Sequence, residues 1–294
     1  MIQFGLPIAF ALFVWWFSTG FILFLDNLPR RTFAWSMGAA TVGVVFAFRG
    51  IAAVADDTTE SGAYCAFACG VAVWGWQEMS FLMGFITGPR RTACPPDCTG
   101  LRHFWHGTQA VIWHELAIAG GAGLIAWLSA GAANQLALWT YCVLWGLRLS
   151  AKLNLFLGVR NLNADLLPEH LTYLASFFRE RAMNALFPIS VTVATVLTLL
   201  FFQRAVAPGA TAFDTNVFTF LGTMMALGLV EHWFMVVPLP FADLWAWYLR
   251  SRDQKRAVLA PVHAVSSCCA AHEGPKVEPD LQPQGLPQYS RAAP

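Results

Sequence analysis

The chain has 294 residues and a formal net charge of +1, and 12% of its residues are charged whereas 57% are hydrophobic. Soluble domains carry about 25% charged residues, so this composition excludes an ordinary water-soluble protein and indicates a surface that largely faces lipid. The near-zero net charge and the lack of a basic block in the sequence argue against a nucleic-acid partner.

Seven apolar segments of the sequence are long enough to cross a bilayer as helices, which requires about 20 mostly apolar residues each. We expect an all-α, polytopic membrane helix bundle of about seven transmembrane helices over residues 1–256. The first segment lacks a basic flank and a cleavage site, so it is expected to be a retained helix and not a signal peptide. The predicted spans are 5–25, 33–55, 62–87, 107–130, 136–158, 185–206 and 216–238.

The distribution of Lys and Arg predicts the orientation of these helices. If the spans alternate in direction, sixteen of the eighteen Lys and Arg residues fall on one side, and only Arg49 and Arg204 on the other. Cytoplasmic loops are enriched in Lys and Arg, so we expect the N-terminus outside and the C-terminus in the cytoplasm, in a bacterial inner (cytoplasmic or intracytoplasmic) membrane. Pro-Arg-Arg-Thr occurs twice, at 29–32 and 89–92. This fits either two groups of basic residues that mark cytoplasmic helix ends, or a repeated pair of helices.

Two segments on the predicted cytoplasmic side are not spans. Residues 164–181 carry Leu167, Leu171, Leu174 and Phe178 at helical spacing, which predicts an interfacial helix that either docks a partner or rests on the bilayer. Residues 257–294 are rich in Pro, Ala, Gln and Ser and predict a disordered cytoplasmic tail.

Ionisable residues inside the predicted spans are the candidate functional residues, because each costs about 2.5–3.5 kcal/mol to insert. At about 1.5 Å per residue, they all lie about 5–8 Å from the bilayer midplane on the cytoplasmic side. Arg148 and Lys152 on the fifth predicted span reach a similar level, and with Asn154 they are candidate partners. This intramembrane polar cluster consists of Glu78, His114, Glu115, Glu231 and His232.

Three interpretations of the cluster are open. Carboxylates and imidazoles suit iron, manganese or zinc on facing helices, although adjacent His-Glu pairs point about 100° apart. In the second interpretation, His114 or His232 is an axial ligand of a tetrapyrrole, either bacteriochlorophyll or haem. In the third, the cluster is an internally paired ion network that fixes helix packing, with Arg148 and Lys152 as counter-charges.

The loop before the fourth predicted span contains a second candidate metal site. Its spacing, C-x3-C-x4-H-x2-H, offers four side chains that can bind zinc but matches no zinc-finger pattern well. Two inert thiols beside interfacial histidines are the alternative. The four residues are Cys94, Cys98, His103 and His106.

Known catalytic motifs are missing from the sequence. It has no Gly-rich phosphate loop, no Gly-x-Ser-x-Gly and no His-Glu-x-x-His. The seventh predicted span has no Lys for a retinal Schiff base. No catalytic residue is therefore predicted.

Several sequence blocks resemble the PuhE family, which are photosynthetic-complex assembly membrane proteins of anoxygenic phototrophic bacteria. The resemblance covers about residues 1–250, and its most specific block is Lys-Leu-Asn-Leu-Phe-Leu-Gly-Val-Arg-Asn at 152–161. The others are Trp-Gln-Glu at 76–78, His-Glu-Leu-Ala at 114–117 and Leu-Leu-Pro-Glu-His-Leu-Thr-Tyr-Leu-Ala-Ser-Phe-Phe at 166–178.

The resemblance implies a non-enzymatic role in building the reaction centre and its antenna, through bacteriochlorophyll supply or contact with reaction-centre, light-harvesting or pigment-synthesis proteins. It implies no catalytic residue. The alternatives are a membrane metalloenzyme that uses the buried Glu and His residues on a pigment precursor or lipid, and a proton-coupled transporter.

Overall fold

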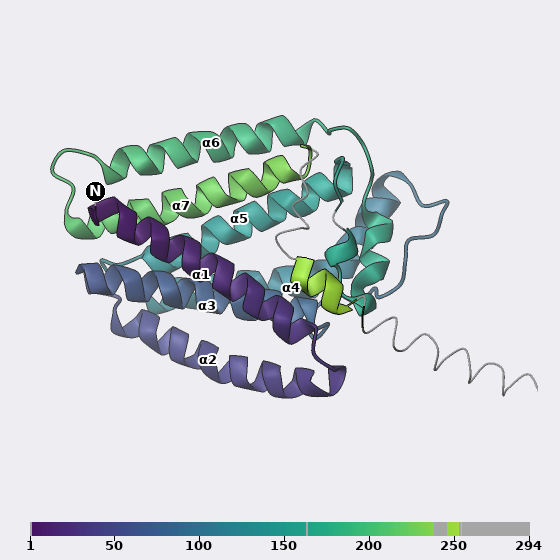
Figure 1. The fold of residues 1–294 in the computed structure, drawn as a ribbon, viewed down its shortest axis with the longest axis horizontal. Coiled ribbons are helices and arrows are strands. Elements are labelled where there is room, and N and C mark those ends of the chain that lie inside the picture. Colours follow the sequence, from purple (N-terminus) through teal and green to yellow (C-terminus); the bar gives the residue numbers. More distant parts are fainter. Residues whose placement is uncertain (1, 163, 238–245, 253, 255–294) are drawn as a thin grey trace, which may run out of the picture. The chain divides into compact units, whose positions relative to one another are not determined.

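The protein is all-helical, in a computed structural model that describes residues 2–162, 164–237, 246–252 and 254. No strand occurs among these residues, so the predicted all-α class is confirmed; the predicted tail, 257–294, lies outside them. Seven long helices of the described chain run alongside one another (Figure 1). They are α1 (Ile2–Asp26), α2 (Phe33–Ala53), α3 (Glu60–Leu82), α4 (Gly100–Leu128), α5 (Leu136–Leu157), α6 (Leu186–Ala205) and α7 (Ala212–Phe234).

Several of these helices are membrane spans by length and apolar composition. Among the residues that the structure describes, five segments qualify: Gln3–Asp26, Arg30–Ala53, Gly100–Leu128, Leu186–Ala205 and Ala212–Phe234. They correspond to α1, α2, α4, α6 and α7, which makes this a multi-pass membrane protein. That α3 and α5 also cross the membrane, and which side of it each end of the bundle faces, stay predictions.

Helix α3 occupies the middle of the bundle. It packs against α1, α2, α4, α5 and α7, and eleven of its 23 residues are buried. Phe67 of α3 stacks on Phe220 of α7 with 4.3 Å between ring centroids. Because other helices cover it, α3 can carry polar residues such as Gln77 and Glu78 that a lipid-facing helix would not tolerate.

Some predicted helix ends differ from the structure. Helix α3 ends at Leu82 and not near 87, because Gly84 adopts the left-handed region with φ of 79° and reverses the chain. Helix α4 starts at Gly100 and not at 107. Helix α7 starts at Ala212 and not at 216, because Thr211 and Asp214 form a capping box.

Residues 164–181 form 3-10 turns and not the α-helix that their spacing suggested. The turns are η2 (Ala164–Leu166) and η3 (Glu169–Phe177). Leu171, Leu174 and Phe177 are buried, and their spacing of three matches the three residues per turn of a 3-10 helix. They pack against Phe81 and Ala110; docking on a partner or the bilayer remains a prediction.

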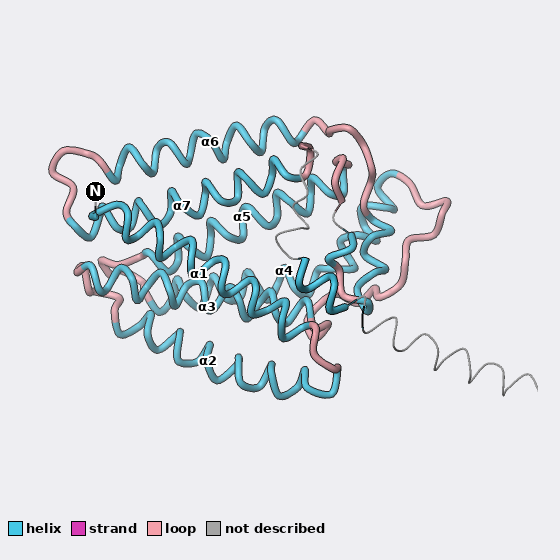
Figure 2. Tube along the Cα trace, in the orientation of Figure 1, coloured by secondary structure: helices cyan, strands magenta, loops and turns pink. Residues whose placement is uncertain are grey.

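The connections that contain most of the loop arginines gather at one end of the bundle, which we call the arginine-rich end (residues 27–32, 83–99 and 158–185). Figure 2 shows these loops together with η3 beside the start of α4. The backbone N–H of Cys94 donates to Ser176 Oγ at 2.9 Å, and His170 Nε2 lies 2.7 Å from the Leu82 carbonyl oxygen. Residues 83–99 are therefore held between α4 and η3.

Gly88 fixes this loop against α4, which predicts that Gly88→Ala destabilises the protein. A Cβ there would collide with the Gln109 carbonyl oxygen and lie 2.6 Å from the Ala110 carbonyl carbon. Backbone atoms cannot move aside as a flexible side chain can, so we expect the free energy of unfolding to fall by about 1–3 kcal/mol. Thermal unfolding in detergent measures this loss. Gly120→Ala is the control, because a Cβ there meets no atom within 4 Å; equal loss in both variants would contradict the prediction.

Candidate functional site

Glu78 of α3 is the centre of the intramembrane polar cluster. Its Oε2 lies 3.0 Å from Arg148 Nη2 of α5, and its Oε1 lies 3.8 Å from His114 Nε2 of α4. The His114 side chain is fully buried and packs on Phe81 with 4.5 Å between ring centroids. Three helices thus meet at one carboxylate that a guanidinium neutralises.

A second ion pair lies beside the first. Lys152 Nζ of α5 lies 2.7 Å from Glu115 Oε1 of α4, and Trp145 Nε1 donates to Glu115 Oε2 at 3.2 Å. The ammonium also sits 5.4 Å from the centroid of the Phe81 ring. Glu78 and Glu115 are therefore both engaged by basic side chains from α5.

The two residues from α7 do not share one environment. Glu231 is exposed on the bundle surface, with Trp15 and Arg148 as neighbours. His232 is buried, and its Nδ1 lies 2.7 Å from the Gly228 carbonyl oxygen, which makes Nδ1 the protonated nitrogen. Its Nε2 lies 2.9 Å from Ser150 Oγ. Both ring nitrogens are thus occupied.

Asn154 belongs to a hydrogen-bond network that extends the cluster toward the arginine-rich end. Its Nδ2 donates to the Ser150 carbonyl oxygen at 3.0 Å and to Ser190 Oγ at 3.1 Å. Asn184 Nδ2 donates to Asn154 Oδ1 at 3.1 Å and to the Gly158 carbonyl oxygen at 2.9 Å. Sequence reasoning missed Asn184 and Ser190, because neutral polar residues near a helix start carry no signal of burial.

This geometry matches a paired ion network better than a metal centre. The five residues do not converge on one point, and Glu78 and Glu115 each face a cation. Within the described chain, the group of His, Cys, Asp and Glu side chains whose ligand atoms lie within 4.8 Å of one another is elsewhere, at Cys94, Cys98 and His106.

The second candidate site is assembled by the turn that precedes α4. Cys98 Sγ lies 3.2 Å from His106 Nδ1, and Cys94 Sγ lies 3.9 Å from the same nitrogen. His103 Nδ1 lies 3.2 Å from Cys94 Sγ. The start of α4 puts His103 and His106 on one face, since they are three residues apart, and the loop brings both thiols over that face.

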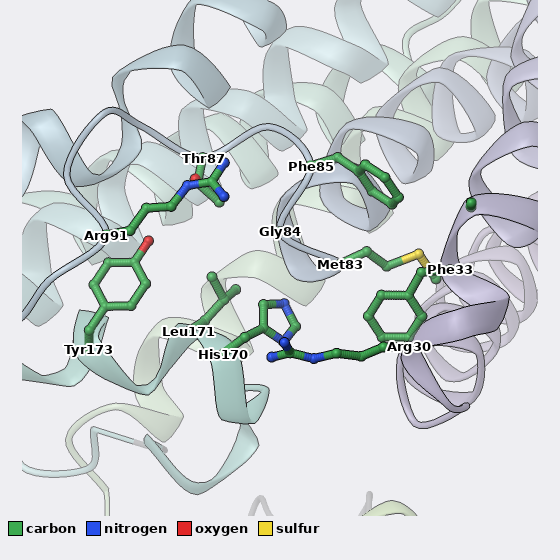
Figure 3. A pocket seen from close by; sticks show the side chains of 11 residues that line it. Arg30, Phe33, Met83, Gly84, Phe85, Thr87, Arg91, His170, Leu171 and Tyr173 are labelled. Carbon is green, nitrogen blue, oxygen red and sulfur yellow. The ribbon is translucent and has the colours of Figure 1, made fainter.

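A cavity of about 410 Å³ opens at the arginine-rich end, between η1 (Arg30–Thr32), the loop after α3, and η3. Figure 3 shows the Arg91 side chain and Thr87 on one side of it, and the Arg30 guanidinium beside the His170 ring. The lining residues are Arg30, Phe33, Ala34, Met83, Gly84, Phe85, Thr87, Arg91, His170, Leu171 and Tyr173. Each Pro-Arg-Arg-Thr segment therefore supplies one arginine.

The polar groups of this cavity are hydrogen-bond donors suited to an anion. The hydroxyl oxygens of Thr87 and Tyr173 are buried, and the two hydroxyls are neighbours in the cavity wall. Burial raises the pKa of Tyr173, which keeps its hydroxyl protonated. Burial and the nearby Arg30 lower the pKa of His170, so its ring is neutral and donates to the Leu82 carbonyl oxygen.

Comparisons with known proteins place the chain among related sequences. Residues 1–256 match the model of a family described as "Protein of unknown function (DUF3623)". The chain is 41% identical over 257 residues to the "Uncharacterized 30.4 kDa protein in puhA 5'region" of Rhodobacter capsulatus. The aligned residues cover 86% of this chain and 93% of that relative. No solved structure matches the chain.

Proposed function

This chain belongs to the DUF3623 family, and on that premise we propose that it is a membrane assembly factor for photosynthetic reaction-centre and antenna complexes. The observation that carries the proposal is the name of its relative, whose gene lies in the 5' region of the reaction-centre gene puhA. The resemblance to PuhE proteins supports the same role. The protein would act in the inner or intracytoplasmic membrane, with its C-terminus in the cytoplasm.

The ion pairs support a non-enzymatic role. A metal ion at these carboxylates would compete with the cations that already engage them, Arg148 at Glu78 and Lys152 at Glu115. Paired charges between α3, α4 and α5 instead hold these helices in register. This favours assembly over the metalloenzyme alternative.

The arginine-lined cavity is the contact site that we assign to this function. Two guanidinium groups and two buried hydroxyls suit a carboxylate or phosphate, and Phe33, Met83 and Leu171 supply an apolar wall. Such a site suits an amphiphile in the membrane, either a pigment precursor or a lipid, whose anionic group reaches the membrane surface.

Deletion of the gene in a native phototroph tests the function. We expect membranes of the deletion strain to lose most reaction-centre and antenna absorption, and expression of the wild-type chain to restore it. Normal levels of both complexes in the deletion strain would refute the proposed function.

The cavity predicts that Arg30→Ser/Arg91→Ser will fail to complement that strain, because removal of both arginines leaves the cavity without a cation to pair with an anion. Absorption of the complexes in isolated membranes measures the effect, and we expect a several-fold deficit. Arg31→Ser/Arg102→Ser removes the same charge from the same end without altering the cavity lining, and it should complement. Equal complementation by both double variants would show that the function does not need the cavity.

A further inference from the structure

The Cys and His side chains before α4 have the geometry of a zinc site. The ligand atoms of Cys94, Cys98 and His106 all lie within 4.8 Å of one another. A tetrahedral zinc ion with Zn–S of about 2.3 Å and Zn–N of about 2.05 Å requires sulfur-to-nitrogen distances of about 3.6 Å. The distances to His106 Nδ1, 3.2 Å from Cys98 Sγ and 3.9 Å from Cys94 Sγ, lie on either side of that value.

The donor types and setting also fit zinc. Both cysteines are free thiols, and Cys98 is buried. Two thiolates and an imidazole are a common zinc ligand set, and they suit zinc better than magnesium or calcium, which prefer oxygen ligands.

We propose that Cys94, Cys98 and His106 bind a zinc ion at the arginine-rich end. No fourth His, Cys, Asp or Glu among the described residues comes within 4.8 Å of all three, so water occupies the fourth position. The ion binds as two thiols lose their protons to solvent, and no redox step is involved. The site is separate from the anion cavity and does not depend on the assembly role.

His103 supports the site from outside the coordination sphere. Its Nδ1 lies 3.2 Å from Cys94 Sγ, and its ring stacks on Phe156 with 5.0 Å between centroids. An N–H donated to a thiolate orients it and stabilises its charge. We expect His103→Phe, which keeps the stacking, to weaken zinc binding by about 10–100-fold without abolishing it.

The zinc ion would cross-link two parts of the chain. Cys94 and Cys98 belong to the loop after α3, and His106 belongs to α4. The loop is also tied to η3 through the hydrogen bond from Cys94 N–H to Ser176 Oγ. A metal at this point therefore fixes the loop that also lines the anion cavity.

Metal analysis of the full chain, purified in mild detergent from zinc-supplemented cells, tests the proposal. We expect about one zinc per chain, and a loss to background in Cys94→Ser/Cys98→Ser. Cys65→Ser/Cys142→Ser is the matched control, since both thiols lie within α3 and α5 away from this site, and it should keep its zinc. Cys268→Ser/Cys269→Ser should keep it too, which excludes the tail cysteines as ligands.

Cobalt titration of the metal-free wild-type chain gives a second readout that needs no variant to fold. Two thiolates on Co²⁺ produce an intense sulfur-to-metal charge-transfer absorption, and zinc should displace it. A wild-type chain with neither bound zinc nor this absorption would overturn the proposal. Retention of zinc by Cys94→Ser/Cys98→Ser would overturn the assignment of the ligands.

Discussion

Lys152→Met is expected to destabilise the protein by about 3–5 kcal/mol, because it leaves the Glu115 carboxylate in the membrane interior without its cation. The two side chains are 20% and 19% exposed and their charged atoms are 2.7 Å apart. Thermal unfolding of the purified chain in detergent, followed by its Trp fluorescence, measures the loss. A drop in the amount of folded protein in membranes should accompany it.

Two controls separate this effect from a general loss of charge. Glu115→Gln/Lys152→Met removes both charges and should recover much of the lost stability. Arg102→Met breaks an ion pair with Asp97 of 3.8 Å, whose side chains are 60% and 75% exposed, and should cost about 0–1 kcal/mol. If the double variant were less stable than Lys152→Met, the interpretation as a compensating pair would fail.

Asn184→Ala is expected to be the most harmful substitution of a neutral residue, with a loss of about 3 kcal/mol from a lost helix cap and newly unpaired buried groups. Asn184 Oδ1 accepts from the backbone N–H groups of Leu186 and Phe187 at the start of α6. Its Nδ2 donates to Asn154 and Gly158. One side chain thus joins the end of α5 to the start of α6.

Asn184→Asp separates the two roles of this side chain. It keeps an acceptor oxygen for the cap of α6 and replaces the donor that faces Asn154 and Gly158. We expect an intermediate stability between the wild type and Asn184→Ala in the same thermal assay. Stability equal to that of Asn184→Ala would contradict this expectation.

The positions of the lipid-facing helices could be predicted from sequence within a few residues. The predictions 5–25, 33–55 and 185–206 correspond to Ile2–Asp26, Phe33–Ala53 and Leu186–Ala205. The length of an apolar run predicts these helices directly, because lipid contacts them along their length. Hydropathy is weaker evidence for α3 and α5, since burial by neighbouring helices replaces the need for apolar side chains.

The depth of the polar cluster in the bilayer could be predicted from the sequence, but the direction in which each side chain points could not. Rise per residue fixes how deep a side chain lies, and it grouped Glu78, His114, Arg148 and Lys152 in one layer. It does not fix the rotation of a helix about its axis, which depends on tertiary packing. That rotation leaves Glu231 exposed while its neighbour His232 is buried.

The 3-10 turns and the anion cavity could not be derived from local patterns. Leu171, Leu174 and Phe177 fit both helix types, and packing against Phe81 and Ala110 selects the tighter one. The repeat at 29–32 and 89–92 was the signal for the cavity, but one sequence does not reveal that both copies meet η3.

The loop between α3 and α4 also constrains the order in which the protein is built. Hydrogen bonds join Cys94 to Ser176 and Leu82 to His170, across 82 and 88 residues of sequence. The ribosome must therefore complete α4, α5 and η3 before this loop can reach its final position. Contacts across such sequence separations form late because chain entropy opposes them. The arginine-rich end can thus mature only after η3 has been made, whereas α1 to α3 can pair while the chain is still being synthesised.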